Sequence, residues 1–160
     1  MAGLHEKLKA KFPEAVTEIH NAYGDETAVV TRESLKQIAE FIKNDPEFSM
    51  NMLMDLTAVD GLWMKWRPRF EMVYHFYSLG KNHRLRLKVK VDEKDLVVPS
   101  LVSFWPIANW FEREVWDMFG IKFDGHPDLK RILMYEEFTG HPLRKDYPIN
   151  KRQPLIGPKN

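Results

Sequence analysis

The chain has 160 residues, of which 44% are hydrophobic and 29% charged, and its formal net charge at pH 7 is +1. This length suits one domain with a sizeable core, and the composition excludes disordered, collagen-like and disulfide-scaffold proteins. Because the chain contains no cysteine, it cannot form disulfides, hold zinc or an iron–sulfur cluster through its own thiolates, or use a cysteine nucleophile.

Residues 1–11 mix charged and apolar side chains, so they lack the apolar core of a signal peptide. No window approaches the roughly 18 consecutive apolar residues of a membrane span. We therefore expect association with a membrane to come through partner proteins only.

The amino-terminal part of the chain predicts two helices and a strand. Apolar residues at helical spacing within residues 4–15 predict a short amphipathic helix, which Pro13 can interrupt. Residues 27–31 are short and β-branched, which favours a strand. A helix capped by Thr31 or Ser34 then continues to about position 43, because its apolar residues keep a 3.6-residue period.

Three strands are predicted in the middle of the chain, at residues 52–59, 70–79 and 84–91. The second is nearly continuously apolar, as expected of a central strand covered on both faces. The third alternates strictly, and with the turn at residues 80–83 it predicts an antiparallel hairpin with a basic outward face. The basic residues of that face are Arg84, Arg86, Lys88 and Lys90.

The last third of the chain begins with a predicted helix and then loses regular hydrophobic periodicity. Pro99 and Ser100 open a short helical turn, and Pro106 suits the first turn of a longer helix that ends before Gly120. Beyond Asp124, prolines accumulate and the hydrophobic periodicity fades, which indicates irregular structure.

These elements predict an α+β fold. A mixed, mostly antiparallel sheet of about four strands, with helices packed on one side, makes up a domain of residues 1–123. Residues 124–160 are expected to form an extended, irregular C-terminal arm that docks on partner subunits, because apolar anchors recur in it without periodicity.

A helical projection of residues 107–120 places one carboxylate in an apolar face. Glu114 falls inside this face, and a buried carboxylate is costly unless it is paired and hydrogen-bonded. We therefore expect Arg131 or Arg144 to meet it. The apolar residues of this face are Ile107, Trp110, Phe111, Val115 and Met118.

The opposite side of the same helix is also apolar. Trp116 and Phe119 lie there beside Glu112, which predicts a helix covered on two sides. Arg113 and Asp117 stand four residues apart and can pair. The pattern leaves open that this is a core helix with a structural ion pair and no further role.

Two histidines in the arm raise a metal site as an alternative. His126 and His141, with Asp124, Asp128 and Asp146 nearby, are ligand types that bind zinc. Each histidine is wedged between a glycine and a proline, without helical two-histidine spacing, so hydrogen bonding to backbone or carboxylate is favoured. No bound metal is expected.

Catalysis and nucleic-acid binding are further alternatives. Glu112, Glu114 and His126 could in principle supply acid–base groups, but the chain has no nucleophile elbow, phosphate loop, zinc-protease motif or dinucleotide fingerprint. The basic hairpin face could suit single-stranded nucleic acid, but the aromatic residues belong mainly to apolar faces. We expect neither an independent active site nor a nucleic-acid partner.

Residues 110–133 closely resemble the signature of the C-type subunit of the proton-pumping NADH:quinone oxidoreductase, respiratory complex I. They begin with the segment Trp-Phe-Glu-Arg-Glu-Val-Trp-Asp-Met-Phe-Gly. Residues 140–148, Gly-His-Pro-Leu-Arg-Lys-Asp-Tyr-Pro, are similar to the second block of that family. The helix–strand pattern before them, from about Leu4, matches its less specific amino-terminal region.

The resemblance implies a non-catalytic subunit of an enzyme that passes electrons from NADH, through FMN and iron–sulfur clusters, to quinone while pumping ions. It implies that FMN and the clusters belong to partner subunits, with no cofactor in this chain. The implied partners are the large D-type subunit, which contributes the quinone site, and neighbouring cluster-bearing subunits of the peripheral arm. The implied location is the cytoplasmic face of the inner membrane. Membrane-bound hydrogenases and F420- or ferredoxin-linked complexes use similar subunits and remain the alternative.

The family motif also suggests which residues carry assembly, through ion pairing and docking rather than bond making. The predicted interface residues are Glu112, Arg113, Glu114, Asp117, His126, Arg131, Arg144, Lys145 and Asp146.

Overall fold

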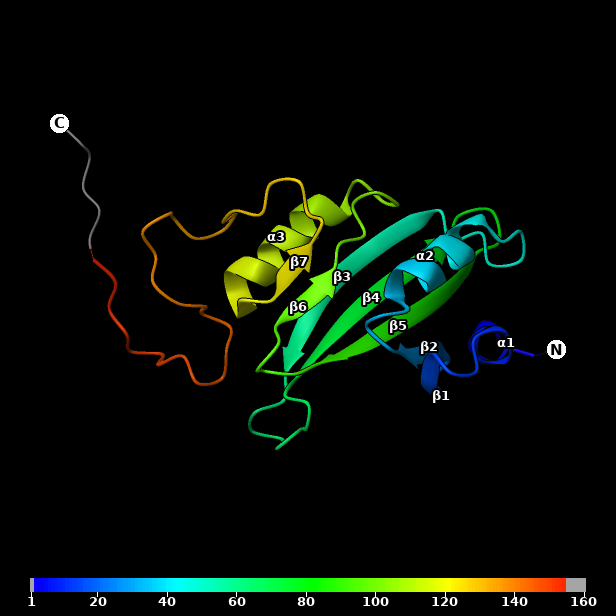
Figure 1. Ribbon diagram of the computed structural model, residues 1–160, viewed down its shortest axis with the longest axis horizontal. Helices are drawn as coiled ribbons and strands as arrows, with labels where there is room; N and C mark the ends of the chain where they lie inside the picture. The colour runs from blue at the N-terminus through cyan, green and yellow to red at the C-terminus, as the bar shows by residue number, and fades with distance from the viewer. Residues whose placement is uncertain (1, 155–160) are drawn as a thin grey trace.

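The structure, a computed structural model, describes residues 2–154, so residues 155–160 of the expected arm lie outside the described residues. The chain forms helices and strands up to residue 124 and continues as an irregular segment (Figure 1). The elements are α1 Leu4–Lys11, β1 Val16–Ala22, β2 Asp25–Val30, α2 Leu35–Asn44, β3 Met52–Asp60, β4 Phe70–Ser78, β5 His83–Val91, β6 Val97–Pro99, α3 Ala108–Phe119 and β7 Lys122–Asp124.

The main sheet has five strands in the order β1-β2-β5-β4-β3. The β2–β5 pair is parallel and the other pairs are antiparallel, so the predicted mixed, mostly antiparallel sheet is confirmed. The predicted hairpin is the β4–β5 pair, whose register runs from Phe70 opposite Val91 to Ser78 opposite His83. The middle strand is β5, and β4 lies next to it.

The prediction of about four strands was one strand short. Strand β1 is an edge strand, and of its residues only Val16 is buried, with the others half-buried or exposed. A strand with so little buried surface need not alternate apolar and polar residues, so it leaves no period-two pattern in the sequence.

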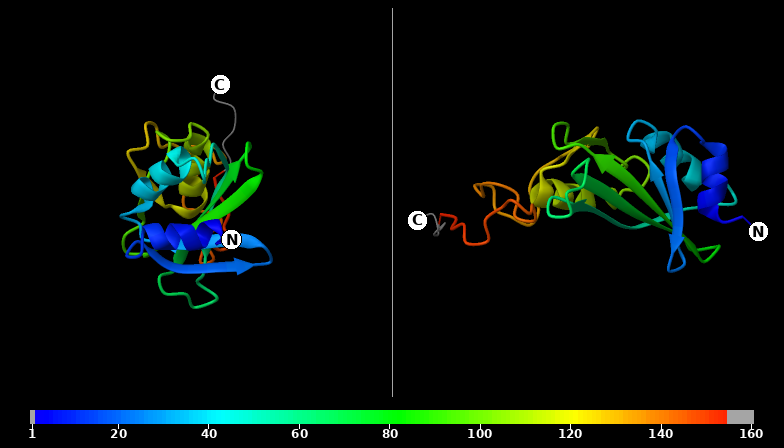
Figure 2. Two further views of the ribbon diagram at one scale, coloured as in Figure 1. Left: turned by 90° about the vertical axis from the view of Figure 1, so that its right-hand side faces the viewer. Right: turned by 90° about the horizontal axis from the view of Figure 1, so that it is seen from below.

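All three helices lie on the same face of the main sheet, and Figure 2 shows this layering from two sides. The face that they cover carries the apolar side chains of β5, from Leu85 to Val91, and α2 adds Leu35, Ile38 and Ile42 to one continuous core. Burial of these apolar side chains is the main force that holds the layers together.

Helix α1 ends earlier than its apolar pattern predicted. Phe12 is its C-cap, and Pro13 follows. Proline has no backbone N–H and clashes with the preceding helical turn, so the helix cannot continue to Ala15. The carbonyl of Ala15 instead accepts a hydrogen bond from Thr31 N–H (2.9 Å) and leads the chain into β1.

A second, two-stranded parallel sheet pairs β6 with β7. Pro99, which was expected to open a helical turn, is the last residue of β6, and the turn follows at residues 101–105. Three-residue strands carry too little pattern to be recognised in a sequence, which is why neither was predicted.

The basic face of β5 points away from the helices, as predicted, but its charges are largely paired. Arg86 lies 2.7 Å from Asp25, and Lys88 lies 2.8 Å from Glu71. Carboxylates of neighbouring strands therefore balance two of the four positive charges on this face at short range.

Residues 125–154 form neither helix nor strand and lie beside α3 at one end of the molecule, drawn in orange and red in Figure 1. None of the helices described between residues 2 and 154 combines the length and the apolar character that crossing a bilayer requires.

Candidate functional site

Helix α3 buries two carboxylates, Glu112 and Asp117, and both are fully buried. Glu112 lies nearer the start of the helix. Its Oε1 accepts a hydrogen bond from the N–H of Leu101 (2.7 Å). Burial raises the pKa of Glu112 to about 7, although the hydrogen bond from Leu101 favours the ionised form. Within residues 2–154, Glu112 Oε2 and the hydroxyl of the fully buried Tyr74 have no hydrogen-bond partner.

The prediction that Glu114 is buried was wrong. Glu114 is exposed, and so are Trp110, at 64%, and Ile107, at 47%. Glu112 and Glu114 are about 200° apart around a helix, so the sheet covers the side that carries Glu112. The helical projection took the side with the large apolar residues at the start of the helix as the buried face. These residues are exposed, so the projection chose the wrong side.

Asp117, fully buried one turn further along α3, is the anchor of the arm. Its Oδ1 accepts a hydrogen bond from Arg131 Nη1 (2.5 Å), and its Oδ2 accepts the backbone N–H groups of Ile132, Leu133 and Met134 at 2.8–3.1 Å. Burial alone would raise the pKa of Asp117, but these hydrogen bonds outweigh it and lower the pKa. The carboxylate therefore remains ionised and fixes the start of the arm.

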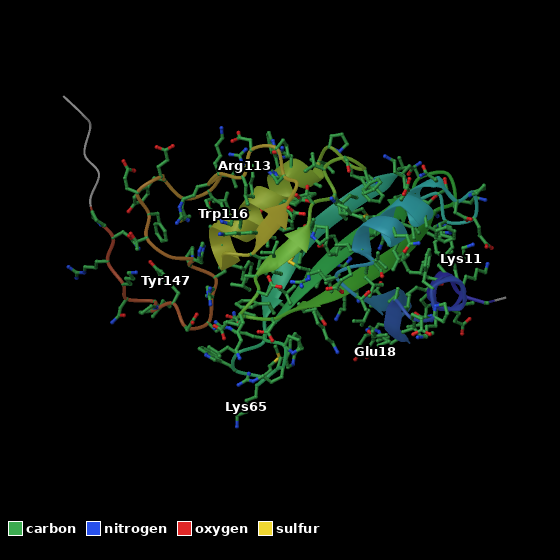
Figure 3. All side chains as sticks on the ribbon, in the orientation of Figure 1. Lys11, Glu18, Lys65, Arg113, Trp116 and Tyr147 are labelled. Atoms are coloured by element: carbon green, nitrogen blue, oxygen red, sulfur yellow. The ribbon has the colours of Figure 1, made fainter. Side chains whose placement is uncertain are left out.

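Arg131 extends this cluster into the arm. Its Nη2 donates to the carbonyls of Phe138 (2.7 Å) and Gly140 (3.2 Å), and its guanidinium lies 5.7 Å from the ring centroid of Trp116. Figure 3 shows Trp116 between α3 and the arm. The prediction of a helix covered on two sides is thus met within this chain, by the sheet and by the arm.

Arg113 and Arg131 do not have the partners that the sequence suggested. The helical spacing of Arg113 and Asp117 would allow them to pair, but Arg113 donates to the backbone carbonyls of Lys130 (3.1 Å) and Arg131 (3.0 Å). Arg131 pairs with Asp117 rather than with Glu114, which is exposed.

The two histidines hold backbone carbonyls, as the favoured interpretation predicted. His126 Nε2 lies 3.1 Å from the carbonyl of Asn109, and its Nδ1 accepts the N–H of Asp128 (3.0 Å). His141 Nδ1 lies 3.0 Å from the carbonyl of Asp117. Among residues 2–154, no group of three or more such side chains is arranged to hold a metal ion.

The C-terminus of α3 makes room for His141. Gly120 has φ +81°, in the left-handed region, and a Cβ there would come within 2.7 Å of the His141 ring. The next anchor is Leu143, whose N–H donates to the carbonyl of Met118 (3.1 Å). The arm is therefore fixed along the whole last turn of the helix.

A second cluster, missed in the sequence, fastens the arm to the sheet. Asp60, at the end of β3, and Arg69, just before β4, are both buried and share two hydrogen bonds of 2.9 and 2.7 Å. Burial would raise the pKa of Asp60, but Arg69 and the N–H of Lys145 lower it to about 2. We call Asp60, Arg69, Asp146, Arg144 and Glu93 the Asp60–Arg69 cluster.

Two predicted interface residues, Asp146 and Arg144, belong to this cluster. Asp146 accepts hydrogen bonds from both terminal nitrogens of Arg69 (2.8 and 3.1 Å), and this contact lowers its pKa. Arg144 lies 3.1 Å from Glu93. Lys145 takes part through its backbone N–H, which donates to Asp60 (2.8 Å), while its side chain is exposed. No sequence signal identifies Asp60 and Arg69, since each resembles the ordinary polar end of a strand.

This arrangement suits fastening rather than acid–base chemistry. Asp60 and Asp117 are held ionised by their partners, so neither exchanges protons near neutral pH. Glu112 titrates near pH 7, but it is fully buried.

Comparison with known proteins gives the relationship that the motifs of residues 110–133 and 140–148 suggested. The chain matches the family described as respiratory-chain NADH dehydrogenase, 30 Kd subunit, over residues 28–153. The C-type subunit of the NADH-quinone oxidoreductase of Roseiflexus sp. (strain RS-1) is 47% identical over 148 residues, covering 92% of this chain and 84% of that relative. The protein of the same name in Geobacter sulfurreducens is 43% identical over 153 residues, covering 94% and 93%.

Solved structures share the fold. The Nqo5 trypsin-resistant fragment (1-134) is 34% identical, with a TM-score of 0.68, over 78% of this chain and 95% of that chain. A chain of the archaeal membrane-bound sulfane sulfur reductase has a TM-score of 0.71 over 91% of this chain and 84% of that one; at 23% identity it shows the fold alone. Together with the family match over most of the chain, these findings establish that the chain belongs to the 30 Kd subunit family of the respiratory-chain NADH dehydrogenase.

Proposed function

We propose that this chain is a non-catalytic structural subunit in the peripheral arm of a proton-translocating NADH:quinone oxidoreductase. In this role it supports electron transfer from NADH, through FMN and iron–sulfur clusters of partner subunits, to quinone. It docks on the large D-type subunit and on neighbouring cluster-bearing subunits, at the cytoplasmic face of the inner membrane, and reaches the membrane only through them. The name shared by its relatives supports this role.

The observation that carries the proposal is that the C-terminal arm has a fixed path without secondary structure and exposes apolar side chains. Residues 125–154 lack helices and strands, yet two ionic clusters fix their path. Ordering a segment without secondary structure costs conformational entropy, and the arm keeps several large apolar side chains exposed, which favours a partner surface over solvent. The exposed residues are Leu133, Tyr135, Leu143 and Ile149.

The predicted interface residues therefore take two roles in this proposal. Asp117, Arg131, Arg144 and Asp146 shape the arm from within, and partners contact the surface that results. Glu114 is exposed on α3 and is free to contact a partner directly.

A related membrane complex is the second candidate. The fold also occurs in the membrane-bound sulfane sulfur reductase, so the fold alone does not select one electron donor. Identity of 43–47% to subunits named for NADH and quinone favours the first candidate.

Purification of a tagged full-length chain from membranes of its own host, followed by mass spectrometry, tests the proposal. We expect the D-type subunit and the flavin- and cluster-bearing subunits to co-purify. Recovery of hydrogenase or ferredoxin-linked subunits would select the second candidate, and recovery of the chain alone would refute both.

Glu114→Ala tests the docking role without disturbing the core, since Glu114 is exposed. We expect assembled complex and NADH:quinone reductase activity to fall together, by roughly two- to tenfold, the range for one interfacial charge. The matched control is Glu40→Ala, an exposed glutamate of α2. Normal assembly with selectively lost turnover would contradict a structural role.

A further inference from the structure

The loop of residues 61–68, which joins β3 to β4, carries the most exposed aromatic side chain outside the arm and the β1–β2 turn. Trp63 is 78% exposed and Met64 is 55% exposed. Lys65 lies at the tip of this 61–68 loop, directed away from the sheet (Figure 3). Neighbouring large apolar side chains at a protruding tip mark an interaction surface more often than isolated ones do.

The 61–68 loop is held in one conformation by its own contacts. Gly61 N–H donates to the carbonyl of Arg69 (2.9 Å), and Trp66 N–H donates to the carbonyl of Gly61 (3.1 Å). The Trp66 side chain fills the space beside Gly61, where a Cβ would come within 2.5 Å of it. A loop ordered before binding loses little entropy when it binds, so its exposed side chains are suited to docking.

The positive charge of the 61–68 loop indicates what kind of partner surface it can bind. Lys65 and Arg67 are exposed, and in the described part of the chain neither lies within 4.0 Å of a carboxylate oxygen. On the β5 face, by contrast, Arg86 and Lys88 are matched by Asp25 and Glu71. Two unmatched cations beside an exposed tryptophan fit a surface that is acidic and apolar.

The loop is also continuous with the fastening of the arm. Asp60 accepts Leu62 N–H (3.0 Å) through Oδ1 and Lys145 N–H (2.8 Å) through Oδ2. One carboxylate therefore fixes both the base of the loop and the arm. The base of the loop and this part of the arm are therefore neighbours in the structure.

We propose that the 61–68 loop is a docking element whose Trp63 enters an apolar pocket, rimmed by carboxylates, on a partner subunit of the same oxidoreductase. This inference rests on the proposed function. Tryptophan and arginine are the side chains that most often dominate protein interfaces. A membrane surface is less well matched, because two cations contribute only about 1 kcal/mol each at an anionic leaflet.

Site-specific photo-crosslinking in the assembled complex tests the contact directly. A photoreactive phenylalanine analogue replaces Trp63 in the full-length chain, and the same analogue replaces Leu79 as control. Leu79 is 65% exposed in the turn between β4 and β5. We expect position 63 to form one adduct, mapping to an acidic segment of an identified subunit. Adducts to lipid only, or an adduct pattern equal to that of position 79, would overturn the proposal.

A charge-reversal variant supplies the quantitative test. Trp63→Ser with Lys65→Glu and Arg67→Glu removes the tryptophan and reverses both charges. Leu79→Ser with Lys81→Glu and Arg84→Glu removes one apolar residue and reverses two exposed charges at the other turn. We expect the first variant to be incorporated about tenfold less when competing with wild type, which corresponds to about 1.4 kcal/mol. The isolated chain should keep its thermal midpoint, and the control should incorporate normally.

Two outcomes separate this inference from the proposed function. If the wild-type chain co-purifies with the oxidoreductase and the loop variant incorporates equally, the inference fails and the proposed function stands. If the wild-type chain binds vesicles of phosphatidylglycerol and the loop variant loses only that binding, the loop is a membrane contact and the inference is overturned. If the wild-type chain does not join the complex, both fail.

Discussion

Glu112 and Asp117 lie on the same helix and are both fully buried, yet their pKa values move in opposite directions. Asp117 receives three backbone N–H groups and a guanidinium, whereas Glu112 receives the N–H of Leu101 and faces an apolar core. The number of donors around each carboxylate, rather than its depth, decides whether it is charged.

The state of Glu112 predicts how stability depends on pH. Folding raises the pKa of Glu112 from 4.5 to about 7. The contribution of Glu112 to the free energy of unfolding is therefore fully present below pH 4.5 and is lost as the pH rises through 7. Glu112→Gln should remove this loss and stabilise the fold at pH 8 by about 3 kcal/mol relative to wild type. Urea unfolding at pH 5, 6, 7 and 8 measures the difference.

Glu114→Gln is the matched control, because it makes the same change two residues away at an exposed position. It should unfold like wild type at every pH. Parallel pH profiles for wild type and Glu112→Gln would show that Glu112 is not the titrating group. His141, whose pKa is lowered by burial, is present in all three proteins and cancels in the comparison.

Sequence reasoning recognised that helix α3 buries a carboxylate but chose the wrong one. The projection treated large apolar residues as buried, whereas Trp110 is mostly exposed and the small Ala108 is fully buried. Side-chain size indicates what a face can bury, not which neighbour covers it. The covering neighbours are β3 and the arm, and their positions are set by contacts distant in the sequence.

At the scale of elements, the end of α3 shows why a glycine stands at position 120. Gly120 and Gly125 share a φ of +81°, but a Cβ at Gly120 meets the His141 ring at 2.7 Å, whereas one at Gly125 meets Lys36 Nζ at 3.6 Å. An alanine at Gly125 therefore tests the cost of backbone strain alone, whereas an alanine at Gly120 tests the cost of strain and of crowding together.

Gly125→Ala should lower the free energy of unfolding by about 1–2 kcal/mol, the cost of a left-handed residue with a Cβ. Gly120→Ala should lower it by a further 1–3 kcal/mol or so, because His141 must also move. Urea denaturation compares the two variants, and hydrogen exchange at Leu143 N–H reports on the arm. Equal losses in both variants would mean that His141 is not held against the helix end.

Strong periodicity identified α2, α3 and strands β2 to β5 within a few residues of their observed bounds. Elements with weak periodicity were not found: β1 because it is an edge strand, β6 and β7 because they are short. Local pattern therefore predicts those elements that bury one full face, and misses those held mainly by backbone pairing.

At the scale of the whole molecule, the Asp60–Arg69 cluster joins residues that are far apart in the sequence. Arg69 has a side chain only 4% exposed and binds three carboxylates, Asp60 at the end of β3, Glu93 after β5 and Asp146 in the arm. Such a junction cannot be predicted from local pattern, since neither spacing nor periodicity links the two regions.

Arg69→Met should loosen the arm and the sheet together. Removing one member of a buried ion pair costs about 3–5 kcal/mol, because Asp60 is left uncompensated. Asp146→Ala, at the half-exposed end of the cluster, should release the arm with little effect on the thermal midpoint. Trypsin cleavage after Lys145 measures arm release, and we expect both variants to be cut faster than wild type.

Arg32→Met is the control for these variants, since the Arg32–Asp95 pair is a surface contact worth about 1 kcal/mol or less. It should be cut at the wild-type rate. Cleavage after Lys145 that is unchanged in both Arg69→Met and Asp146→Ala would place the fastening of the arm elsewhere.

The position of Arg69 also orders events as the polypeptide leaves the ribosome. Its partner Asp146 is synthesised 77 residues later, and Arg69 is in place only after β3 and β4 have aligned, because Gly61 and Arg69 close that hairpin. The contact between Arg69 and the tail therefore forms only after β3 and β4 have paired, whereas the contacts of the tail with Asp117 on α3 do not depend on that pairing. A newly made chain in which β3 and β4 have not paired therefore lacks one of the two ionic clusters that fix its tail.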